Sequence, residues 1–317
     1  MTIRKLSLVL CLIAVAAIAV IGQHRSRAIA ITIDDLPVMS SRDDVESRRE
    51  IIRNLIAKIT AAKVPVIGFV NESQLYDDGK LDEEQVDLLR EWLNAGLDLG
   101  NHTYSHLSLN KVGLSEYEND VLKGEIVTKE LLKALGKEIR YFRHPYLETG
   151  LTLKTKAEFN KFLASHGYSI APITMDNSDW IFADAYDKTF AASDYKLMDR
   201  IAKAYVPYVE RKMIYWERQS RRLFGREIRQ IMLMHASFIN SVYFSDVVKM
   251  LKRRGYRFIS LTEALKDRAY RLPDRFTEDA GVSWLTRWAA AKGERYILPN
   301  EPITPKFVLT AAGLRSE

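Results

Sequence analysis

The sequence predicts an α/β protein built on a parallel sheet or barrel, and three observations favour this fold class. Residues 28 to about 269 alternate between short apolar runs and longer amphipathic stretches, the pattern of repeated strand–helix units. The first run, residues 28–33, is nearly all apolar and β-branched, as a strand buried on both faces should be. The chain of 317 residues is also long enough for one α/β barrel with additions.

The strands and helices are expected in alternation along the chain. Apolar runs of strand length recur at residues 28–33, 64–70, 97–99, 140–143, 168–174, 230–234 and 256–260. After the first of them, Ile51, Leu55 and Ile59 repeat at a four-residue spacing, which predicts an amphipathic helix. Asp82 with Gln85 resembles a capping box and predicts the start of the next helix.

Glycines mark the ends of the helices in the first half of the chain. Gly96 is placed to end the helix that Asp82 opens. Ser115 with Glu118 predicts the start of a further helix, and Gly136 predicts its end.

Two stretches depart from the repeating pattern. Residues 181–228 are long, charged and aromatic, which predicts a helical insertion packed beside the active face. Its aromatic residues are expected in the core, although some could line a groove. Residues 271–317 carry several prolines and two tryptophans, and we expect one short helix and an extended tail wrapped on the barrel. The aromatic residues of the insertion are Tyr205, Tyr208, Tyr215, Trp216 and Phe224.

Residues 1–22 have the composition of an export leader. Arg4 and Lys5 precede an almost unbroken apolar run at residues 6–21, which is short for a membrane span of about 20 residues. A cleaved signal peptide is the first interpretation and an uncleaved anchor the second, so we expect a periplasmic or extracellular protein. The single Cys11 lies inside this leader, so the mature protein would have no thiol for a disulfide, for catalysis or for a metal.

The charge pattern bears on partners and domain organisation. The net charge of +6 is modest and the basic residues are scattered, which argues against a nucleic-acid partner. Membrane contact is expected only through an uncleaved leader, and the sequence does not indicate an oligomeric state. We expect one catalytic domain at residues 23–270, after the leader and before a C-terminal extension at residues 271–317.

Residues capable of chemistry recur directly after the predicted strands. Because the carboxyl ends of parallel strands meet on one face, side chains spread over some 200 positions are expected to meet there. His and Asp ligands with a spare carboxylate suit a mononuclear hydrolytic metal site. Singly, each residue has a structural explanation, such as a helix cap for an Asp or a core position for a His. The residues are Asp34, Asp35, His102, His106, Arg143, Asp176, Asp179 and His235.

Five ordered motifs resemble those of the polysaccharide deacetylases, the NodB-homology group or carbohydrate esterase family 4. The resemblance covers roughly residues 28–265 and implies an irregular (β/α) barrel, here with a helical insertion and a C-terminal extension. The motifs are Thr32-Ile33-Asp34-Asp35, Gly100-Asn101-His102-Thr103-Tyr104-Ser105-His106, Phe142-Arg143-His144-Pro145-Tyr146, Asp176-Asn177-Ser178-Asp179-Trp180 and Met232-Leu233-Met234-His235.

The resemblance implies a ligand set for one divalent cation. Asp35, His102 and His106 would hold the ion and leave positions open for water and the substrate carbonyl. Zn²⁺ suits this set best, and Co²⁺, Mn²⁺ or Fe²⁺ would also fit.

The resemblance also implies catalytic roles. Asp34 would be the general base towards the metal-activated water, with Arg143 setting its basicity. The backbone N–H of Tyr146 would help to stabilise the oxyanion. His235 would protonate the departing amine, and Asp179 would orient and charge His235.

The walls of the substrate slot are where the sequence departs from the family pattern. Pro145 and Trp180 would wall the slot for the acetyl group. The family commonly has Gly after its Asp pair, where this chain has Leu36, and His144 and Leu147 also depart from the usual third motif. None of these changes removes a catalytic group. His144 is an extra titratable residue near the metal that could contact substrate.

The sequence therefore predicts a metal-dependent hydrolase that removes N-acetyl groups from an N-acetylated glycan, acting on a carbon–nitrogen bond other than a peptide bond. An O-acetyl esterase or a small-molecule amidase on the same metal site is the alternative among enzymes. The insertion at residues 181–228 could narrow the groove and favour a short oligosaccharide or a small amide. A glycan-binding protein without turnover is the alternative outside enzymes.

Overall fold

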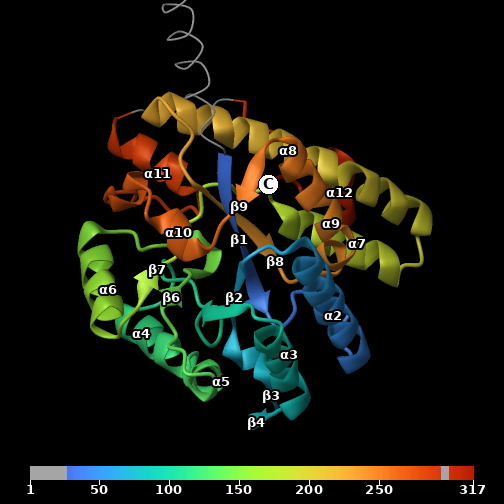
Figure 1. The fold of residues 1–317 in the computed structure, drawn as a ribbon, viewed down its shortest axis with the longest axis horizontal. Helices are drawn as coiled ribbons and strands as arrows, with labels where there is room; N and C mark the ends of the chain where they lie inside the picture. Colours follow the sequence, from blue (N-terminus) through green and yellow to red (C-terminus); the bar gives the residue numbers. More distant parts are fainter. Residues whose placement is uncertain (1–26, 294–299) are drawn as a thin grey trace, which may run out of the picture.

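A curled sheet of seven strands, with every pair parallel, forms the centre of the computed structural model, which describes residues 27–293 and 300–317 (Figure 1). The strand order is β7-β6-β5-β2-β1-β8, and β9 pairs with β1 beside this path. The strands are β1 (Arg27–Leu36), β2 (Val66–Val70), β5 (Asp98–Asn101), β6 (Tyr141–Phe142), β7 (Ser169–Ile170), β8 (Gln230–His235) and β9 (Tyr256–Phe258).

The chain that follows β7 brings the two ends of this strand order together. Thr174 and Met175 both donate their backbone N–H to the carbonyl of Ile231 in β8, at 2.9 and 3.0 Å. The backbone N–H of Leu233 in turn donates to the Met175 carbonyl, at 3.1 Å. The sheet therefore curls into an irregular barrel, which confirms the predicted fold class.

Helices surround the sheet (Figure 1). The first covering helix begins at its cap Asp44, which accepts from the N–H of Ser47, and buries the predicted residues Ile51, Leu55 and Ile59. The helices are α2 (Val45–Ala62), α3 (Glu83–Asn94), α4 (Leu114–Lys123), α5 (Ile126–Ala134), α6 (Leu153–Ser165), α7 (Asp179–Ala191), α8 (Tyr195–Phe224), α9 (Phe238–Arg253), α10 (Leu261–Leu265), α11 (Trp284–Ala291) and α12 (Lys306–Ala312).

Short elements complete the described chain. A two-stranded hairpin pairs β3 (Tyr76–Asp77) with β4 (Lys80–Leu81), and the 3-10 turns are η1 (Glu72–Leu75), η2 (Pro145–Leu147) and η3 (Arg268–Arg271). Among the described residues, no helix combines the length and apolarity that a membrane span requires. The predicted leader at residues 1–22 lies outside the described residues.

Two predicted helix signals differ from the structure in detail. The helix expected from Ser115 to Gly136 is two helices, because the chain breaks at Gly124, where a Cβ would lie 2.3 Å from the backbone carbon of Thr103. Asp82 caps α3 by accepting from the N–H of Glu84, whereas the Gln85 side chain accepts from Arg48 and does not close a capping box.

The predicted insertion is a pair of helices, α7 and α8. Four of its five aromatic residues are buried, as expected, and Phe224 is half-buried against Trp288. α7 packs on α8, α9 and α12, and α8 packs on α9 and α11, so the insertion joins the barrel to the C-terminal residues.

The C-terminal segment contains a second helix that was not predicted. α12 follows Pro305 and buries Val308 and Leu309, and it packs against α7. Proline is well tolerated where a helix starts, because the missing N–H has no partner inside the helix there. The expectation of one helix and an extended tail was therefore wrong.

Candidate active site

Six of the eight residues predicted at strand ends line one cleft of about 470 Å³. Asp34 stands opposite His235 in the register of β1 and β8, and His102 follows β5 directly. Arg143 and Asp179 lie behind these residues and contact them. The described residues that line the cleft include Asp34, Asp35, His102, His106, His144, Tyr146, Asp176, Trp180 and His235.

Asp35, His102 and His106 offer three ligand atoms that all lie within 4.8 Å of one another. The Nε2 atom of each histidine is 3.5 Å from Asp35 Oδ1, an oxygen that has no hydrogen-bond partner among the described residues. Burial lowers the pKa of His102 well below its usual value and lowers the pKa of His106, so both imidazoles are neutral. One carboxylate and two neutral imidazoles fit a divalent cation.

The second-layer contacts of His102 settle which nitrogen faces the ligand cluster. Its Nδ1 lies 2.7 Å from the backbone carbonyl of Arg143. A carbonyl only accepts, so Nδ1 carries the proton and Nε2 is left with a free lone pair.

The loop that carries the two histidines is held in a strained conformation. Thr103 and His106 have φ values of 66° and 55°, and Asp35 has a φ of 63°. Non-glycine residues rarely adopt this left-handed region unless the surroundings impose it. Here the Asn101 side chain accepts from the N–H of Thr103 at 2.7 Å, and the Thr103 hydroxyl accepts from the N–H of His106 at 3.0 Å.

The helix break at Gly124 gives this loop its outer support. The carbonyl of Asp120, in the last turn of α4, accepts from the N–H of Tyr104 at 3.0 Å. The Asp120 carboxylate accepts from the N–H of Ser105 at the same distance. The end of α4 therefore fixes the backbone between the two histidines.

Asp34 is a buried carboxylate paired with a buried guanidinium. Arg143 Nη1 lies 3.2 Å from Asp34 Oδ2, and Arg143 Nη2 donates to the Thr32 hydroxyl at 2.9 Å. Burial raises the pKa of Asp34 to about 6, and the positive charge of Arg143 opposes that rise. The second oxygen, Oδ1, has no hydrogen-bond partner among the described residues. Asp34 is thus ionised at neutral pH with one oxygen free to accept a proton.

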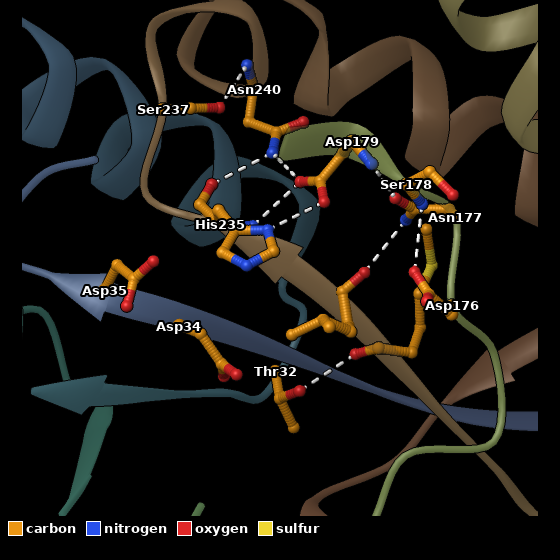
Figure 2. A network of polar contacts seen from close by, with 12 residues as sticks. Thr32, Asp34, Asp35, Asp176, Asn177, Ser178, Asp179, His235, Ser237 and Asn240 are labelled. Carbon is orange, nitrogen blue, oxygen red and sulfur yellow. Dashed lines mark hydrogen bonds and ion pairs between the residues drawn. The ribbon is translucent and has the colours of Figure 1, made fainter. Parts of the chain in front are cut away.

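His235 lines the cleft, and Asp179 contacts it from behind. Figure 2 shows the contacts between the two residues. Its Nδ1 lies 2.8 Å from Asp179 Oδ1, and its backbone N–H donates to Asp179 Oδ2 at 2.8 Å. Burial alone lowers the pKa of His235, but the Asp179 carboxylate outweighs this effect and the pKa rises to about 10. His235 therefore holds a proton at neutral pH and can act as an acid.

Comparisons with known proteins agree with this geometry. Residues 22–170 match the family described as polysaccharide deacetylase. That range includes the Asp34–Asp35 pair, both histidines of the ligand cluster and Arg143.

Over residues 22–170 this chain is similar to the polysaccharide deacetylase family. The recognition made from the motifs is therefore confirmed.

A curated relative and several solved structures are similar to this chain. The peptidoglycan-N-acetylglucosamine deacetylase of Bacillus cereus is 27% identical over 165 residues, which are 52% of this chain and 50% of the relative. The chain thus matches only about half the length of that relative.

The similar solved structures concern the fold. A mutant of a carbohydrate esterase family 4 pseudoenzyme with restored enzymatic activity, whose wild type is from Bacillus anthracis, has a TM-score of 0.52 at 16% identity, over 76% of this chain and 68% of that chain. A peptidoglycan N-acetylglucosamine deacetylase bound to an N-oxidanyl-benzamide has a TM-score of 0.50 at 19% identity, over 76% and 89%. At these identities the likeness supports the barrel fold of this chain and no more.

The predicted slot residues Trp180 and Pro145, and the predicted oxyanion donor Tyr146 beside them, differ in their exposure. Trp180 is 42% exposed at the cleft and Tyr146 is 55% exposed, with its ring 4.4 Å from that of His106. Pro145 is buried and is not among the described residues that line the cleft. Tyr146 has a φ of 55°, which turns its backbone sharply at the cleft.

His144 is a buried residue that lines the cleft. Its ring packs edge-on against Phe142 and Phe159, with centroids 5.1 and 5.4 Å away. Neither ring nitrogen has a hydrogen-bond partner among the described residues. Burial lowers the pKa of His144 to about 3, so the ring is neutral.

Sequence reasoning missed several residues that shape the cleft. Gly281, from the C-terminal extension, lines the cleft, and a Cβ at this position would lie 1.9 Å from the Tyr146 carbonyl oxygen. No spacing in the sequence links position 281 to Tyr146. Asn240, whose side chain donates to Asp179, follows His235 by five residues among buried apolar positions of α9. A polar residue in that apolar stripe was the signal that could have revealed it.

Proposed function

We propose that this protein is a metal-dependent deacetylase that hydrolyses the N-acetyl group of an N-acetylated glycan. One observation carries the proposal: the Asp35–His102–His106 cluster, a buried base candidate and a protonated histidine face the same cleft. Hydrolysis of an amide needs an activated water, a stabilised oxyanion and a protonated leaving group. The cleft supplies a candidate for each need.

The proposed roles follow from the contacts of each residue. A divalent cation held by Asp35, His102 and His106 would supply a Lewis acid for the acetyl carbonyl and would lower the pKa of a water. Asp34 takes a proton from the attacking water, whose oxygen bonds to the acetyl carbon. The backbone N–H of Tyr146 faces the developing oxyanion. His235 gives its proton to the nitrogen as the C–N bond breaks, leaving acetate and a free amine.

Support for a glycan substrate comes from the similarity to the polysaccharide deacetylase family and to the peptidoglycan-N-acetylglucosamine deacetylase of Bacillus cereus. We propose Zn²⁺ as the metal, because Asp and His ligands suit it, with Co²⁺, Mn²⁺ or Fe²⁺ as substitutes. We also propose export to the periplasm or beyond, with residues 6–21 as a signal peptide or anchor. Trp180 and Tyr146 are proposed to contact the sugar at the mouth of the cleft.

Two other functions remain as outcomes of the test. An O-acetyl esterase or a small-molecule amidase would use the same residues. A glycan-binding protein without turnover has a precedent in the pseudoenzyme of similar fold. All the ligand and acid–base positions predicted for catalysis are filled here, which favours turnover.

The test is acetate release by the purified protein, stripped of metal and then reloaded with Zn²⁺. The panel contains chitooligosaccharides, peptidoglycan fragments and acetylated xylan. We expect metal-dependent release from one of the N-acetylated glycans and none from the stripped protein. Release from acetylated xylan alone would reassign the protein as an esterase. Metal binding without release from any substrate would contradict the proposed deacetylation.

A further inference from the structure

The Asp179–His235 pair continues into the interior through two buried side chains. Asn240, in the first turn of α9, places its Nδ2 2.5 Å from Asp179 Oδ2 and 2.9 Å from the His235 carbonyl (Figure 2). Tyr205, on α8, places its hydroxyl 2.5 Å from Asn240 Oδ1. Both side chains are fully buried. A continuous line of hydrogen bonds therefore runs from α8 to the candidate acid.

The partners fix the direction of every hydrogen bond in this line. The amide nitrogen of Asn240 faces a carboxylate and a carbonyl, which only accept. Its amide oxygen is thereby turned to Tyr205, whose hydroxyl must donate. Burial raises the pKa of Tyr205 well above its usual value, so that hydroxyl keeps its proton.

The Asp179 carboxylate receives donors only. The backbone N–H of His235 and the amide of Asn240 donate to Oδ2, and His235 Nδ1 lies on Oδ1. Because each of these neighbours donates to it, the Asp179 carboxylate acts only as a hydrogen-bond acceptor. His235 Nδ1 therefore keeps its proton. The nitrogen that can deliver a proton into the cleft is therefore His235 Nε2.

The Asn240 side chain is not needed to cap its own helix. Ser237 is the N-cap of α9 and accepts from the backbone N–H of Asn240. The Asn240 amide is thus available for Asp179 and His235. The backbone of Asp179 has a separate anchor, because its N–H donates to the Asn177 side chain at 2.9 Å.

We propose that Tyr205 and Asn240 are positioning residues for acid catalysis by His235. They hold the Asp179 carboxylate in the orientation that keeps the His235 ring aimed into the cleft. The inference rests on the proposed function and deepens it, since it assigns a role to α8, which lies outside the matched residues 22–170. The helical insertion then serves proton delivery as well as packing.

The experiment uses two substrates that differ in their need for an acid. An amine leaves an N-acetyl group only when it is protonated, whereas a nitrophenolate leaves an aryl acetate without a proton. Tyr205→Phe removes one hydroxyl, and Asn240→Leu removes the amide at similar volume. We expect kcat on an N-acetyl chitooligosaccharide to fall about 10–100-fold, the range for residues that orient a reacting group from behind. The kcat on 4-nitrophenyl acetate should stay within about twofold of wild type, with KM and bound metal unchanged.

Two matched variants control for loss of a buried hydroxyl. Tyr256 is a buried tyrosine on β9 whose hydroxyl donates to Glu217, and Ser241 is buried next to Asn240 and donates to the Phe238 carbonyl. Tyr256→Phe and Ser241→Ala should leave both activities near wild type. In a His235→Ala background, Tyr205→Phe should cost nothing further, because both changes act on the same step.

The outcomes separate the inference from the proposed function. Equal losses on the amide and the aryl ester, or a further loss in the His235→Ala background, would show a structural role and overturn the inference. Unchanged amide hydrolysis in folded Tyr205→Phe would overturn it too, and this mild variant remains informative if Asn240→Leu does not fold. A wild-type protein that hydrolyses neither substrate at full metal loading would instead overturn the proposed function.

Discussion

The metal side of the cleft and its acid side are built differently. The metal side comes from the ends of β1, β5 and β6, all within the matched residues 22–170, and its loops are held by nearby backbone and side chains. The acid side comes from β8, α7 and α9, beyond that range. It is supported by α8 and by α12, which packs against α7. The turns that present the two histidines are thus closed by near neighbours in the sequence, whereas the acid is held by side chains far from it in the sequence.

This difference between the two sides indicates which regions of the chain can change metal binding and which can change proton delivery. The loop of His102 and His106 is closed by residues two or three positions away and is supported by Asp120 and Arg143. All of these lie within residues 22–170, so changes in the second half of the chain should leave metal binding intact. Asp179 is reached by residues 56 to 61 positions away, and the line continues to Tyr205. Changes in the second half of the chain should therefore alter proton delivery without altering the metal.

The largest effect is expected on the metal side, from His102→Ala. Removing one of three protein ligands leaves a pair that cannot hold the ion tightly. We expect loss of stoichiometric metal and of all measurable acetate release, checked by metal analysis of the purified variant. The control is His166→Ala, an exposed histidine that matches no motif. Full metal content in the His102 variant would refute the ligand assignment.

Asp34→Asn should separate the base from the metal on the same side. The amide oxygen can still accept from Arg143, so the buried guanidinium keeps a partner. The amide cannot take a proton from water, and we expect kcat to fall about 10²–10⁴-fold with metal content unchanged. Thermal unfolding of the variant tests whether the fold survives. Substantial turnover in a folded, metal-loaded variant would exclude Asp34 as the base.

The role of His235 as the acid can be tested by the pH dependence of kcat/KM in the variant Asp179→Asn. The pKa of His235 is raised to about 10 because the Asp179 carboxylate outweighs burial, with smaller contributions from Asp35 and Asp34. An acid must be protonated, so activity is lost as pH rises through this pKa. Without the carboxylate the alkaline limb of kcat/KM should move to lower pH by about 1–3 units. An unchanged alkaline limb would mean that another group protonates the amine.

The metal side was predictable because its signals are local. Asp34, Asp35, His102, His106 and Arg143 directly follow apolar runs, and parallel strands bring such ends together. Each residue could be recognised from its own local sequence, and the parallel sheet then brings the residues together.

The more distant supports of both sides were not predictable, because each joins positions far apart in the sequence. The break at Gly124 is set by the backbone of Thr103, and the wall at Gly281 by the carbonyl of Tyr146. The partnership of Tyr205 with Asn240 depends on how α8 packs on α9. These contacts cannot be predicted from residue type or spacing in the sequence.

A smaller effect is expected from Arg287→Leu, which tests the C-terminal extension against the metal side. Arg287 is buried, donates to the Leu147 carbonyl and to Thr149, and pairs with Asp274 at 3.1 Å. It therefore holds the loop that carries Tyr146. We expect kcat/KM to fall about tenfold through displacement of this loop, with metal content unchanged.

The exposed Arg271 of the same extension provides the control, and Arg271→Leu should have no effect. If Arg287→Leu lost metal as well, the extension would support the ligand cluster and the two sides would not be separable.

The smallest effect on activity is expected from Asp267→Asn. Asp267 does not line the cleft, so its replacement should alter only the stability of the fold. Asp267 pairs with Arg226 at 2.6 Å and accepts from the backbone N–H groups of Arg229 and Ala269. Burial opposes its ionisation, but these donors outweigh burial and lower its pKa to about 2. A depressed carboxylate pKa stabilises the fold above the unfolded value of 3.8, and that stability disappears as pH falls through about 2.

Wild type should therefore exceed Asp267→Asn by on the order of 1–2 kcal/mol in free energy of unfolding at neutral pH. The two proteins should converge in acid, as urea titrations at several pH values would show. Acetate release by the folded variant should match wild type, because Arg226 and Asp267 join the end of the insertion to the segment after α10 and do not line the cleft. A loss of turnover at full folding would mean that the packing of the second half reaches the acid from even this distance.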